Sequence, residues 1–347
     1  MSRFNRLGHF LYISGLGIIV LITSPCDEPL PEDDGEEAGI PLVFYSERDG
    51  NREIYLTDSR GEDLRRLTYH PADDVDPKWS PDGQKVVFSS DRGGDFDIYL
   101  LYIKTGEIKP LSVSEGDDVH PEWSPDGGRI VFQSNRRGNY DIFIMDSTGE
   151  NQRGLTTNLL ADITPQWAPD GERIAFVSYR DGNAELYLMD HSGLNMRRLT
   201  INPRQDQEPR WSPDGTKIAF STHRSGDEDL YVLDITDSWE RNLTNTAGDD
   251  WNPCWSPEGE WIYYYTFMDE QIYKVNLKGD APIRLTSGPG SCVDLTVSSD
   301  GELLAFASDR DGDLEVFVLD SSGAQLDQIT SSAGVDRFPR FGPGERE

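Results

Sequence analysis

The chain repeats one unit of 44 residues, and this period constrains the fold more than any other feature. The pentapeptide Trp-Ser-Pro-Asp-Gly begins at Trp79, and its Trp recurs at Trp123, Trp167, Trp211 and Trp255. Eroded copies follow at 297–301 and 341–344. Self-similarity at a fixed period is typical of repeat architectures, in which each unit buries its surface against the next. The sequence therefore predicts seven copies of one structural unit.

Each unit predicts four short strands. In the copy from Pro121 to Leu155, Ser124 to Gly127 has the Pro and Gly placement of a tight turn. The segments 129–134 and 141–146 are rich in β-branched and aromatic residues, as strands are. A last strand is predicted over 152–156, and no helical period is seen after residue 39.

Four strands every 40 to 45 residues indicate the blade of a β-propeller. The first predicted strand, 42–46, lacks an inner strand before it, and the last, 338–341, lacks a second strand after it. We therefore predict an all-β fold, a seven-bladed β-propeller of four-stranded antiparallel blades. The ring is closed by the C-terminal strand joining the N-terminal blade.

The unit resembles the WD40-like repeat of TolB-type propellers. Residues 165–190 and 209–234 carry the pattern Pro-x-Trp-Ser-Pro-Asp-Gly, then Ile-Ala-Phe, and then an aromatic and apolar strand, with Ala168 in place of the Ser in the first copy. The resemblance covers 41–347. It implies the fold and leaves the function open, because this scaffold serves many roles. TolB has six blades and an additional N-terminal domain, and this sequence shows neither.

The N-terminal 26 residues have the pattern of a secretory signal. Arg3 and Arg6 precede an apolar run over 10–22, which is short for a membrane-spanning helix. Cys26 follows at the position of a lipidated cysteine in bacterial lipoproteins, although Pro25 and Thr23 depart from that motif. Lipidation at Cys26, plain export and an uncleaved anchor are three alternatives.

Residues 27–39 hold seven Asp or Glu and two Pro, which predicts an acidic flexible linker. The predicted organisation is a signal peptide over 1–26, this linker, and a propeller over 40–347. The predicted localisation is the cell envelope, periplasmic or extracytoplasmic, with the membrane contacted only through an N-terminal anchor or lipid.

The formal net charge is −31, from 63 acidic and 32 basic residues. Such a chain repels phosphate, which argues against nucleic acid as a partner. Three cysteines do not form a disulfide framework, and a bridge between Cys254 and Cys292 is a minor alternative. We expect a monomer that binds protein partners and needs no cofactor.

Two charged residues recur once per unit. An Asp lies five residues before most of the Trp positions, and an Arg lies in the loop after the second strand. One copy has Cys292 for the Asp, and one has Met268 for the Arg. We predict a structural clamp between blades, with a ligand or ion site as the alternative. In the predicted clamp, the Arg of one blade pairs with the Asp of the next blade. The predicted pairs are Arg48 with Asp74, Arg92 with Asp118, Arg136 with Asp162, Arg180 with Asp206, Arg224 with Asp250, and Arg310 with Asp336. This pairing places Met268 opposite Cys292.

Blades 6 and 7 depart most from the repeat. The loop after the second strand shortens to Met268-Asp269-Glu270, and aromatic residues crowd nearby. We consider two explanations, an interaction surface or bulk that refills the space of the lost pair. The candidate residues are Trp251, Tyr264, Phe267, Met268 and Cys292.

Candidate chemistry elsewhere is weak. Asp309, Asp311 and Asp313 alternate as in half a calcium loop, but a turn with solvated acids explains them as well. No two of the five His have metal-ligand spacing, and the sequence has no Gly-x-Ser-x-Gly elbow.

We therefore predict a non-catalytic protein-binding or scaffold module that uses its acidic loop face. The alternative is a propeller enzyme of carbohydrate lyase or hydrolase type at the channel mouth. Asp76, Glu208 and Asp294 would be its candidate acids, with His120 close by.

Overall fold

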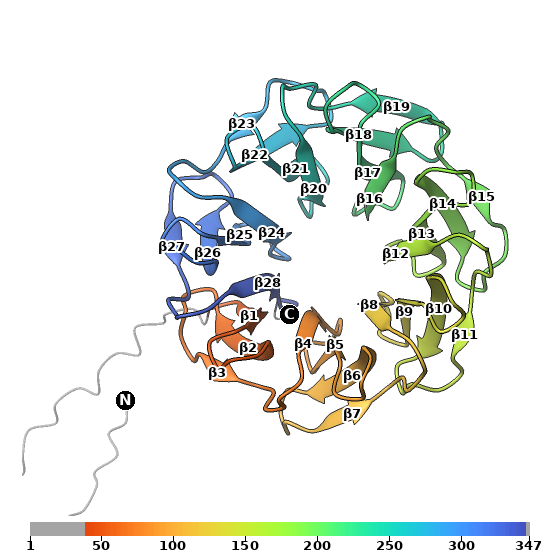
Figure 1. Ribbon diagram of the computed structural model, residues 1–347. Coiled ribbons are helices and arrows are strands. Elements are labelled where there is room, and N and C mark those ends of the chain that lie inside the picture. Colours follow the sequence, from red (N-terminus) through yellow and green to blue (C-terminus); the bar gives the residue numbers. More distant parts are fainter. Residues whose placement is uncertain (1–38, 345–347) are drawn as a thin grey trace, which may run out of the picture. The chain divides into compact units, whose positions relative to one another are not determined.

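The computed structural model describes residues 39–344, which form one seven-bladed β-propeller (Figure 1). Seven four-stranded antiparallel sheets surround a central channel, as the repeat predicted. Within these residues no helix is long and apolar enough to cross a membrane. The predicted signal peptide, Cys26 and nearly all of the linker lie outside the described residues.

The strands of a blade are called A to D from the channel outward. The A strands are β28 (Asp336–Phe341), β4 (Asp74–Trp79), β8 (Asp118–Trp123), β12 (Asp162–Trp167), β16 (Asp206–Trp211), β20 (Asp250–Trp255) and β24 (Cys292–Val297), for blades 1 to 7 in that order. The B strands are β1 (Pro41–Ser46), β5 (Lys85–Ser90), β9 (Arg129–Ser134), β13 (Arg173–Ser178), β17 (Lys217–Thr222), β21 (Trp261–Thr266) and β25 (Leu303–Ser308).

The C strands are β2 (Glu53–Asp58), β6 (Asp97–Tyr102), β10 (Asp141–Asp146), β14 (Glu185–Asp190), β18 (Asp229–Asp234), β22 (Gln271–Asn276) and β26 (Glu315–Asp320). The D strands are shorter: β3 (Arg65–Arg66), β7 (Ile108–Pro110), β11 (Arg153–Gly154), β15 (Arg197–Arg198), β19 (Trp239–Asn242), β23 (Ile283–Arg284) and β27 (Leu326–Gln328).

Because strand direction alternates, the B–C and D–A loops lie at one end of the propeller, here called the loop face. The A–B and C–D turns lie at the other end. The repeated pentapeptide forms the A–B turn: Gly83 N–H donates to the Ser80 carbonyl at 2.9 Å, and Gly83 has a φ of 67°. That left-handed backbone is the reason for Gly at this position.

Neighbouring blades are joined by the repeated Trp. The ring of Trp123 packs with Val87, Ile98 and Leu100 of blade 2, and its indole N–H donates to the Lys78 carbonyl of that blade at 3.3 Å. Trp79, Trp211 and Trp255 make the equivalent bond to the preceding blade. Each Trp therefore supplies apolar area to an interface between blades, and all of the five except Trp167 add one directed bond.

The core of each blade holds an aromatic pair, one ring on strand B and one on strand C. The fully buried B-strand rings are Phe44, Phe88, Phe132, Phe176, Phe220, Tyr264 and Phe306. Tyr264 follows Phe220 by 44 residues and stacks on Tyr273 with centroids 5.9 Å apart. The suggestion that Tyr264 belongs to an interaction surface is therefore wrong, because it is a core ring of blade 6.

The two ends of the described chain meet in blade 1, as predicted. Strand β28 pairs with β1, aligning Leu42 with Phe341 and Ser46 with Asp336. Gly342 N–H extends the ladder to the Pro41 carbonyl at 2.7 Å. Closure by a strand from the far end of the sequence leaves β1 without a free edge.

Removing residues 336–347 is expected to destabilise the whole propeller, because β1 then has a free edge and the apolar faces of blades 1 and 7 lose contacts. We expect the melting temperature to fall by about 10 °C or more, since each kcal/mol lost shifts it by roughly 2–4 °C. Thermal unfolding followed by circular dichroism measures this. A control lacking only 345–347 should melt like the full chain, and equal melting of the longer truncation would contradict closure as a source of stability.

Candidate functional site

A buried Arg–Asp pair recurs on the loop side of the blades, but it lies within each blade and does not join two blades. Arg92 Nη2 donates to both Asp74 oxygens at 2.8 Å, and Asp74 begins the A strand of the blade that carries Arg92. The other pairs follow this rule: Arg48 with Asp336, Arg136 with Asp118, Arg180 with Asp162, and Arg224 with Asp206. The predicted pairing with the next blade is therefore wrong.

Antiparallel register explains the correction. Strands A and B of one blade are hydrogen-bonded neighbours, so the first residue of A lies opposite the last residue of B; Asp74 aligns with Ser90. Arg92, two residues later, donates its Nε–H to Ser90 Oγ at 2.9 Å and covers the Tyr99 ring at 4.6 Å. The register within one sheet therefore identifies the partner, which residue spacing alone does not.

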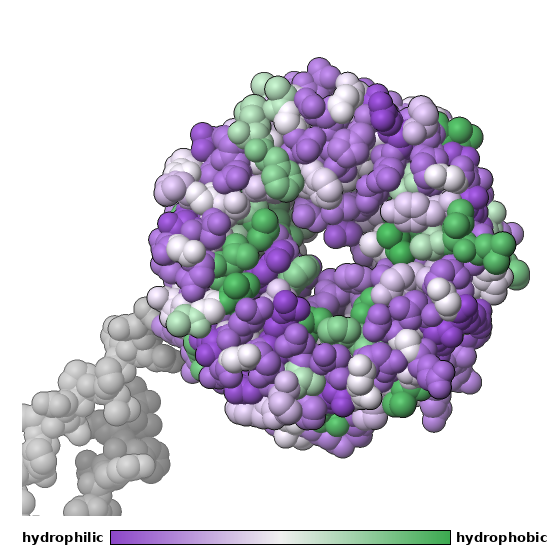
Figure 2. All heavy atoms as spheres, viewed as in Figure 1, coloured by the Kyte–Doolittle hydropathy of each residue, from purple (hydrophilic) through white to green (hydrophobic). Residues whose placement is uncertain are grey.

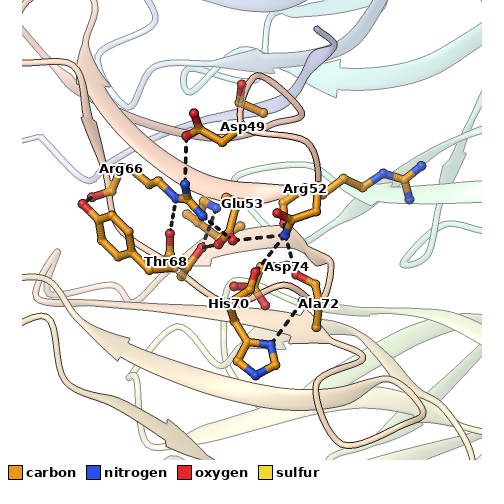
Figure 3. A network of polar contacts seen from close by, with 12 residues as sticks. Asp49, Arg52, Glu53, Arg66, Thr68, His70, Ala72 and Asp74 are labelled. Atoms are coloured by element: carbon orange, nitrogen blue, oxygen red, sulfur yellow. Dashed lines mark hydrogen bonds and ion pairs between the residues drawn. The ribbon is translucent and has the colours of Figure 1, made fainter.

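A second buried carboxylate ties strand C to strand D in the same blade. Figure 3 shows it in blade 1, where Glu53 binds Thr68 and Arg66, and Arg66 also reaches Asp49. The Thr68 hydroxyl accepts from Ile54 N–H at 2.8 Å. These bonds fix the D–A loop that leads to Asp74, so the loop face is rigidly supported.

Blades 6 and 7 each keep half of the Arg–Asp pair. In blade 6, buried Asp250 has no Arg beside it, because Met268 takes that place; Thr246 donates to Asp250 Oδ2 at 2.8 Å. In blade 7, Arg310 Nη2 lies 3.4 Å from the Cys292 sulfur. Asp250 in blade 6 therefore lacks its Arg, and Arg310 in blade 7 lacks its Asp. The prediction that Met268 and Cys292 face each other, so that one whole pair is missing, is wrong.

The other predicted residues of this region divide between surface and interior. Phe267 and Met268 are more than half exposed, and Phe267 contacts the rings of Trp251 and Tyr265 edge-on. Cys292 is buried, and both Cys254 and Cys292 are free thiols. An exposed aromatic patch thus exists at Phe267.

The central channel is lined by two rings of A-strand residues. The outer channel ring, nearer the loop face, holds the third residue of each A strand, and all seven have φ between 49° and 59°. The register of every A–B pair shifts at this point, as expected for β-bulges. Its members are Asp76, His120, Thr164, Glu208, Asn252, Asp294 and Phe338.

Left-handed backbone at non-glycine residues is costly and is found mainly where function or packing demands it. Here the bulge lets residues on neighbouring A strands meet. His120 Nδ1 lies 3.1 Å from Asp76 Oδ2, and Asn252 N–H donates to Glu208 Oε2 at 2.9 Å. The sequence had selected three carboxylates and one His of this ring as candidates, and the structure places all four on it.

The carboxylates of the outer channel ring are held by polar partners. Asp294 accepts from Arg337 Nε at 2.7 Å and from Nη2 at 3.1 Å. Asp76 also lies 3.3 Å from Lys78 Nζ. Burial opposes ionisation of Asp76, but Lys78, His120 and Arg340 outweigh it and lower its pKa. Asp76 is therefore held in its ionised form, and both Asp76 and Asp294 are engaged by basic side chains, which suits binding better than proton transfer.

The other His do not join this site. His70 Nδ1 accepts from Ala72 N–H (Figure 3), His223 lies 3.1 Å from Glu228, and His191 contacts Glu172 at the opposite face. Burial raises the pKa of Glu228 to about 7.

The calcium candidate is not supported. Asp309 accepts from Ser291 N–H, and Asp313 accepts from Gly334 N–H. In the part of the chain that the structure describes, no group of three or more His, Cys, Asp or Glu side chains could hold a metal. Asp309 and Asp313 therefore each bind the backbone of a neighbouring D–A loop.

The loop face also exposes large apolar side chains in four consecutive blades. Their exposed fractions are 74% for Tyr69, 79% for Val113, 92% for Leu159 and 84% for Ile201. All four lie in D–A loops. Tyr69, Val113 and Ile201 stand at the same position of the 44-residue repeat, a signal that the sequence reasoning had missed. Figure 2 shows apolar patches separated by a predominantly hydrophilic surface around the central opening.

Replacing Arg224 with Met, the residue of blade 6, is expected to destabilise the propeller. It leaves fully buried Asp206 without a counter-charge, which costs about 3–5 kcal/mol. The double variant Arg224→Met/Asp206→Asn should recover much of this loss. Chemical denaturation of both single variants and of the double variant measures the coupling, and strictly additive losses would contradict the pair.

Asp250→Asn is expected to raise the melting temperature by a few degrees at pH 7. Burial raises the pKa of Asp250, so its contribution to stability is full at low pH and is lost as pH rises through that raised pKa. Asn does not titrate, so the advantage should vanish toward pH 4. The matched control Asp206→Asn should instead destabilise, because Arg224 Nη2 then loses its fully buried carboxylate partner, and Arg224 keeps Glu240 on Nη1. A lower melting temperature for Asp250→Asn at every pH would contradict this account.

Comparison with known proteins agrees with this architecture. A family model described as the TolB beta propeller domain matches residues 36–115, 96–209 and 203–346. A search of curated proteins finds no match. Among solved structures, TolB from Acinetobacter baumannii is 21% identical with a TM-score of 0.58, over 88% of this chain and 67% of that one.

Other similar structures are enzymes. An oligogalacturonate lyase in complex with manganese is 18% identical with a TM-score of 0.70, over 81% of this chain and 85% of that one. A puromycin hydrolase is 15% identical with a TM-score of 0.69, over 86% of this chain and 53% of that one. At these identities the likeness shows the fold alone. The family model spans nearly the whole propeller, so the chain belongs to the TolB β-propeller domain family.

Proposed function

We propose that this protein is a non-catalytic binding module that docks a protein partner on its loop face. The observation that carries the proposal is the set of exposed apolar side chains in the D–A loops of blades 1 to 4. Exposed apolar side chains that recur on one face, blade after blade, can supply the anchors of a protein interface. Phe267 and Met268 add apolar surface on the same face.

The negative charge of the protein indicates which kind of partner would bind it. The formal net charge is −31, and exposed acids such as Glu115, Asp227 and Glu270 lie in the loops of this face. A partner with a basic surface and apolar side chains is complementary to it, and the opposite charges would speed association and set specificity. The hydrogen-bonded carboxylates below the loops keep this surface rigid, which lowers the entropic cost of binding.

The proposed location is the cell envelope. The N-terminal pattern of a basic start, an apolar run and Cys26 supports export, with the acidic segment 27–39 as a tether. A propeller tethered in this way would meet other proteins of the envelope.

A second candidate is a propeller enzyme of lyase or hydrolase type acting at the channel mouth. The contact between His120 and Asp76 favours it, because a carboxylate beside a His orients the ring for acid–base work. Against it, Asp76 and Asp294 are already paired with basic side chains, and Glu208 accepts a backbone N–H. The binding proposal therefore fits the geometry better.

The two candidates separate in one experiment on the full chain. Leu159→Ser/Ile201→Ser should weaken capture of the partner from the native envelope fraction at least ten-fold. Leu194→Ser is the matched control, because Leu194 is equally apolar, 67% exposed and in a C–D turn at the opposite face. Quantitative mass spectrometry of the captured proteins measures the change.

The expected partner binds wild type and the Leu194 variant alike, and its capture falls as salt is raised. Equal capture by the loop-face variant would contradict the binding proposal. Loss of a substrate turnover in His120→Ala, with partner capture unchanged, would support the enzyme instead.

A further inference from the structure

The channel has a second ring of side chains, the inner channel ring, two residues further along each A strand. Contacts between neighbouring strands place these residues around the channel; for example, Gln166 Nε2 donates to Glu122 Oε2 at 2.5 Å. The ring holds three cations and a single acid. Its members are Lys78, Glu122, Gln166, Arg210, Cys254, Thr296 and Arg340.

This composition is opposite to that of the chain as a whole. Three basic residues and one acid give the ring a formal charge of +2, in a protein with 63 acidic and 32 basic residues. Structural needs do not explain the excess, because the Trp residues that follow these positions already join the blades. An excess of half-buried cations lining the channel of an acidic protein points to an anionic ligand.

Two of the cations lack an acidic partner. Arg210 Nη1 donates to the Pro209 carbonyl at 3.2 Å, and Arg340 Nη1 donates to the Pro339 carbonyl at 2.9 Å. Arg340 also lies over the Phe338 ring at 5.8 Å. Within residues 39–344 no ion pair joins either guanidinium to a carboxylate. Each therefore keeps donors free for an oxyanion.

The remaining charges of the ring are engaged. Lys78 is shared with Asp76 of the outer channel ring at 3.3 Å. Glu122 accepts from Gln166 and, at 3.2 Å, from Trp167 N–H. Burial raises the pKa of Glu122 to about 6, although Lys78 and Arg210 oppose the rise. Both Glu122 oxygens are thus engaged by Gln166 and Trp167, and no ion pair joins Glu122 to Arg210 or Arg340 within residues 39–344.

The cations also act on one another. Burial and the nearby Arg340 and Arg210 lower the pKa of Lys78, even though Asp76 and Glu122 oppose the change. Arg210 and Arg340 both lie close enough to Cys254 to lower its pKa against the larger effect of burial, which raises it. Arg210 and Arg340 occupy equivalent positions on the A strands of two different blades, β16 and β28, so the geometry of the strands places both on the inner channel ring.

We propose that the inner channel ring binds a small oxyanion, a phosphate or carboxylate group, between Arg210 and Arg340. A guanidinium presents a planar fork of donors that matches such oxygens, and two forks from separate blades would hold one anion. Lys78 adds charge from a third blade. The proposal does not depend on the loop-face partner, because it concerns side chains inside the channel.

The test titrates the full chain with inorganic phosphate and, separately, with citrate at constant ionic strength set by sodium chloride. Isothermal titration calorimetry measures affinity. The wild type should bind one anion saturably, and Arg210→Gln and Arg340→Gln should each weaken binding at least ten-fold. The matched control Lys278→Gln removes one exposed positive charge outside the channel and should bind like wild type. Tighter phosphate or tighter citrate assigns the class of anion, and either supports the site.

A second variant tests the site by a gain in stability. Cys254→Asp places a carboxylate beside Arg210 and Arg340, so the chain supplies its own anion. We expect its melting temperature without ligand to rise and phosphate binding to disappear. This outcome differs from misfolding, which would lower the melting temperature.

Two results would overturn the proposal. One is wild-type affinity for both anions in Arg210→Gln, Arg340→Gln and Cys254→Asp. The other is loss of binding in Arg65→Gln/Lys104→Gln alone, which would move the anion to the basic groove of about 480 Å³ between blades 1 and 2. Absence of binding to wild type would equally reject the site.

Discussion

Closure of the ring is the constraint on which the rest of the structure depends. A single blade has two apolar faces, and only a neighbour on each side buries both. The last blade finds its neighbour because β28 pairs with β1, joining residues almost 300 positions apart in the chain. Without that pairing, the apolar faces of blades 1 and 7 would lose contacts, and the channel would lose its continuous wall.

The Arg–Asp pairs stabilise each blade within this ring. A carboxylate such as Asp74, fully buried at the start of an A strand, needs a counter-charge, and Arg92 of the same sheet supplies it. The cation is itself placed by Ser90 and Tyr99. The pair is therefore a property of one blade, which explains why blade 6 can lose its Arg while blade 7 loses its Asp.

The channel differs from the blades because its residues are free of the packing that repeats elsewhere. Seven bulges turn one residue of each A strand toward its neighbours, and those seven positions hold five different polar side chains and one Phe, with Asp the only residue repeated. The inner channel ring also holds a different residue in most blades, and three of its seven residues are cations. Residues at equivalent positions of the two channel rings can differ between blades, because the backbone of the A strand places them and no repeated side-chain packing is required.

The sequence alone determined the fold to a high degree. A 44-residue period, Pro-Gly turns and complementary ends specify seven four-stranded blades and their closure, because strand patterns and turns are local signals. It also identified the four outer-ring candidates Asp76, His120, Glu208 and Asp294. Residue spacing identified these four residues because equivalent positions of the repeat occupy equivalent positions in successive blades.

Only the tertiary structure decided which side chains meet. Spacing gave an Arg and an Asp per repeat but not their pairing, which depends on the antiparallel register within one sheet. Spacing likewise did not reveal the role of Arg210 and Arg340 in the inner channel ring, because whether such a side chain has a carboxylate partner depends on which side chains lie beside it in the closed ring. Periodicity fixes where each residue lies in its own blade, whereas contacts between distant blades exist only after the ring has closed.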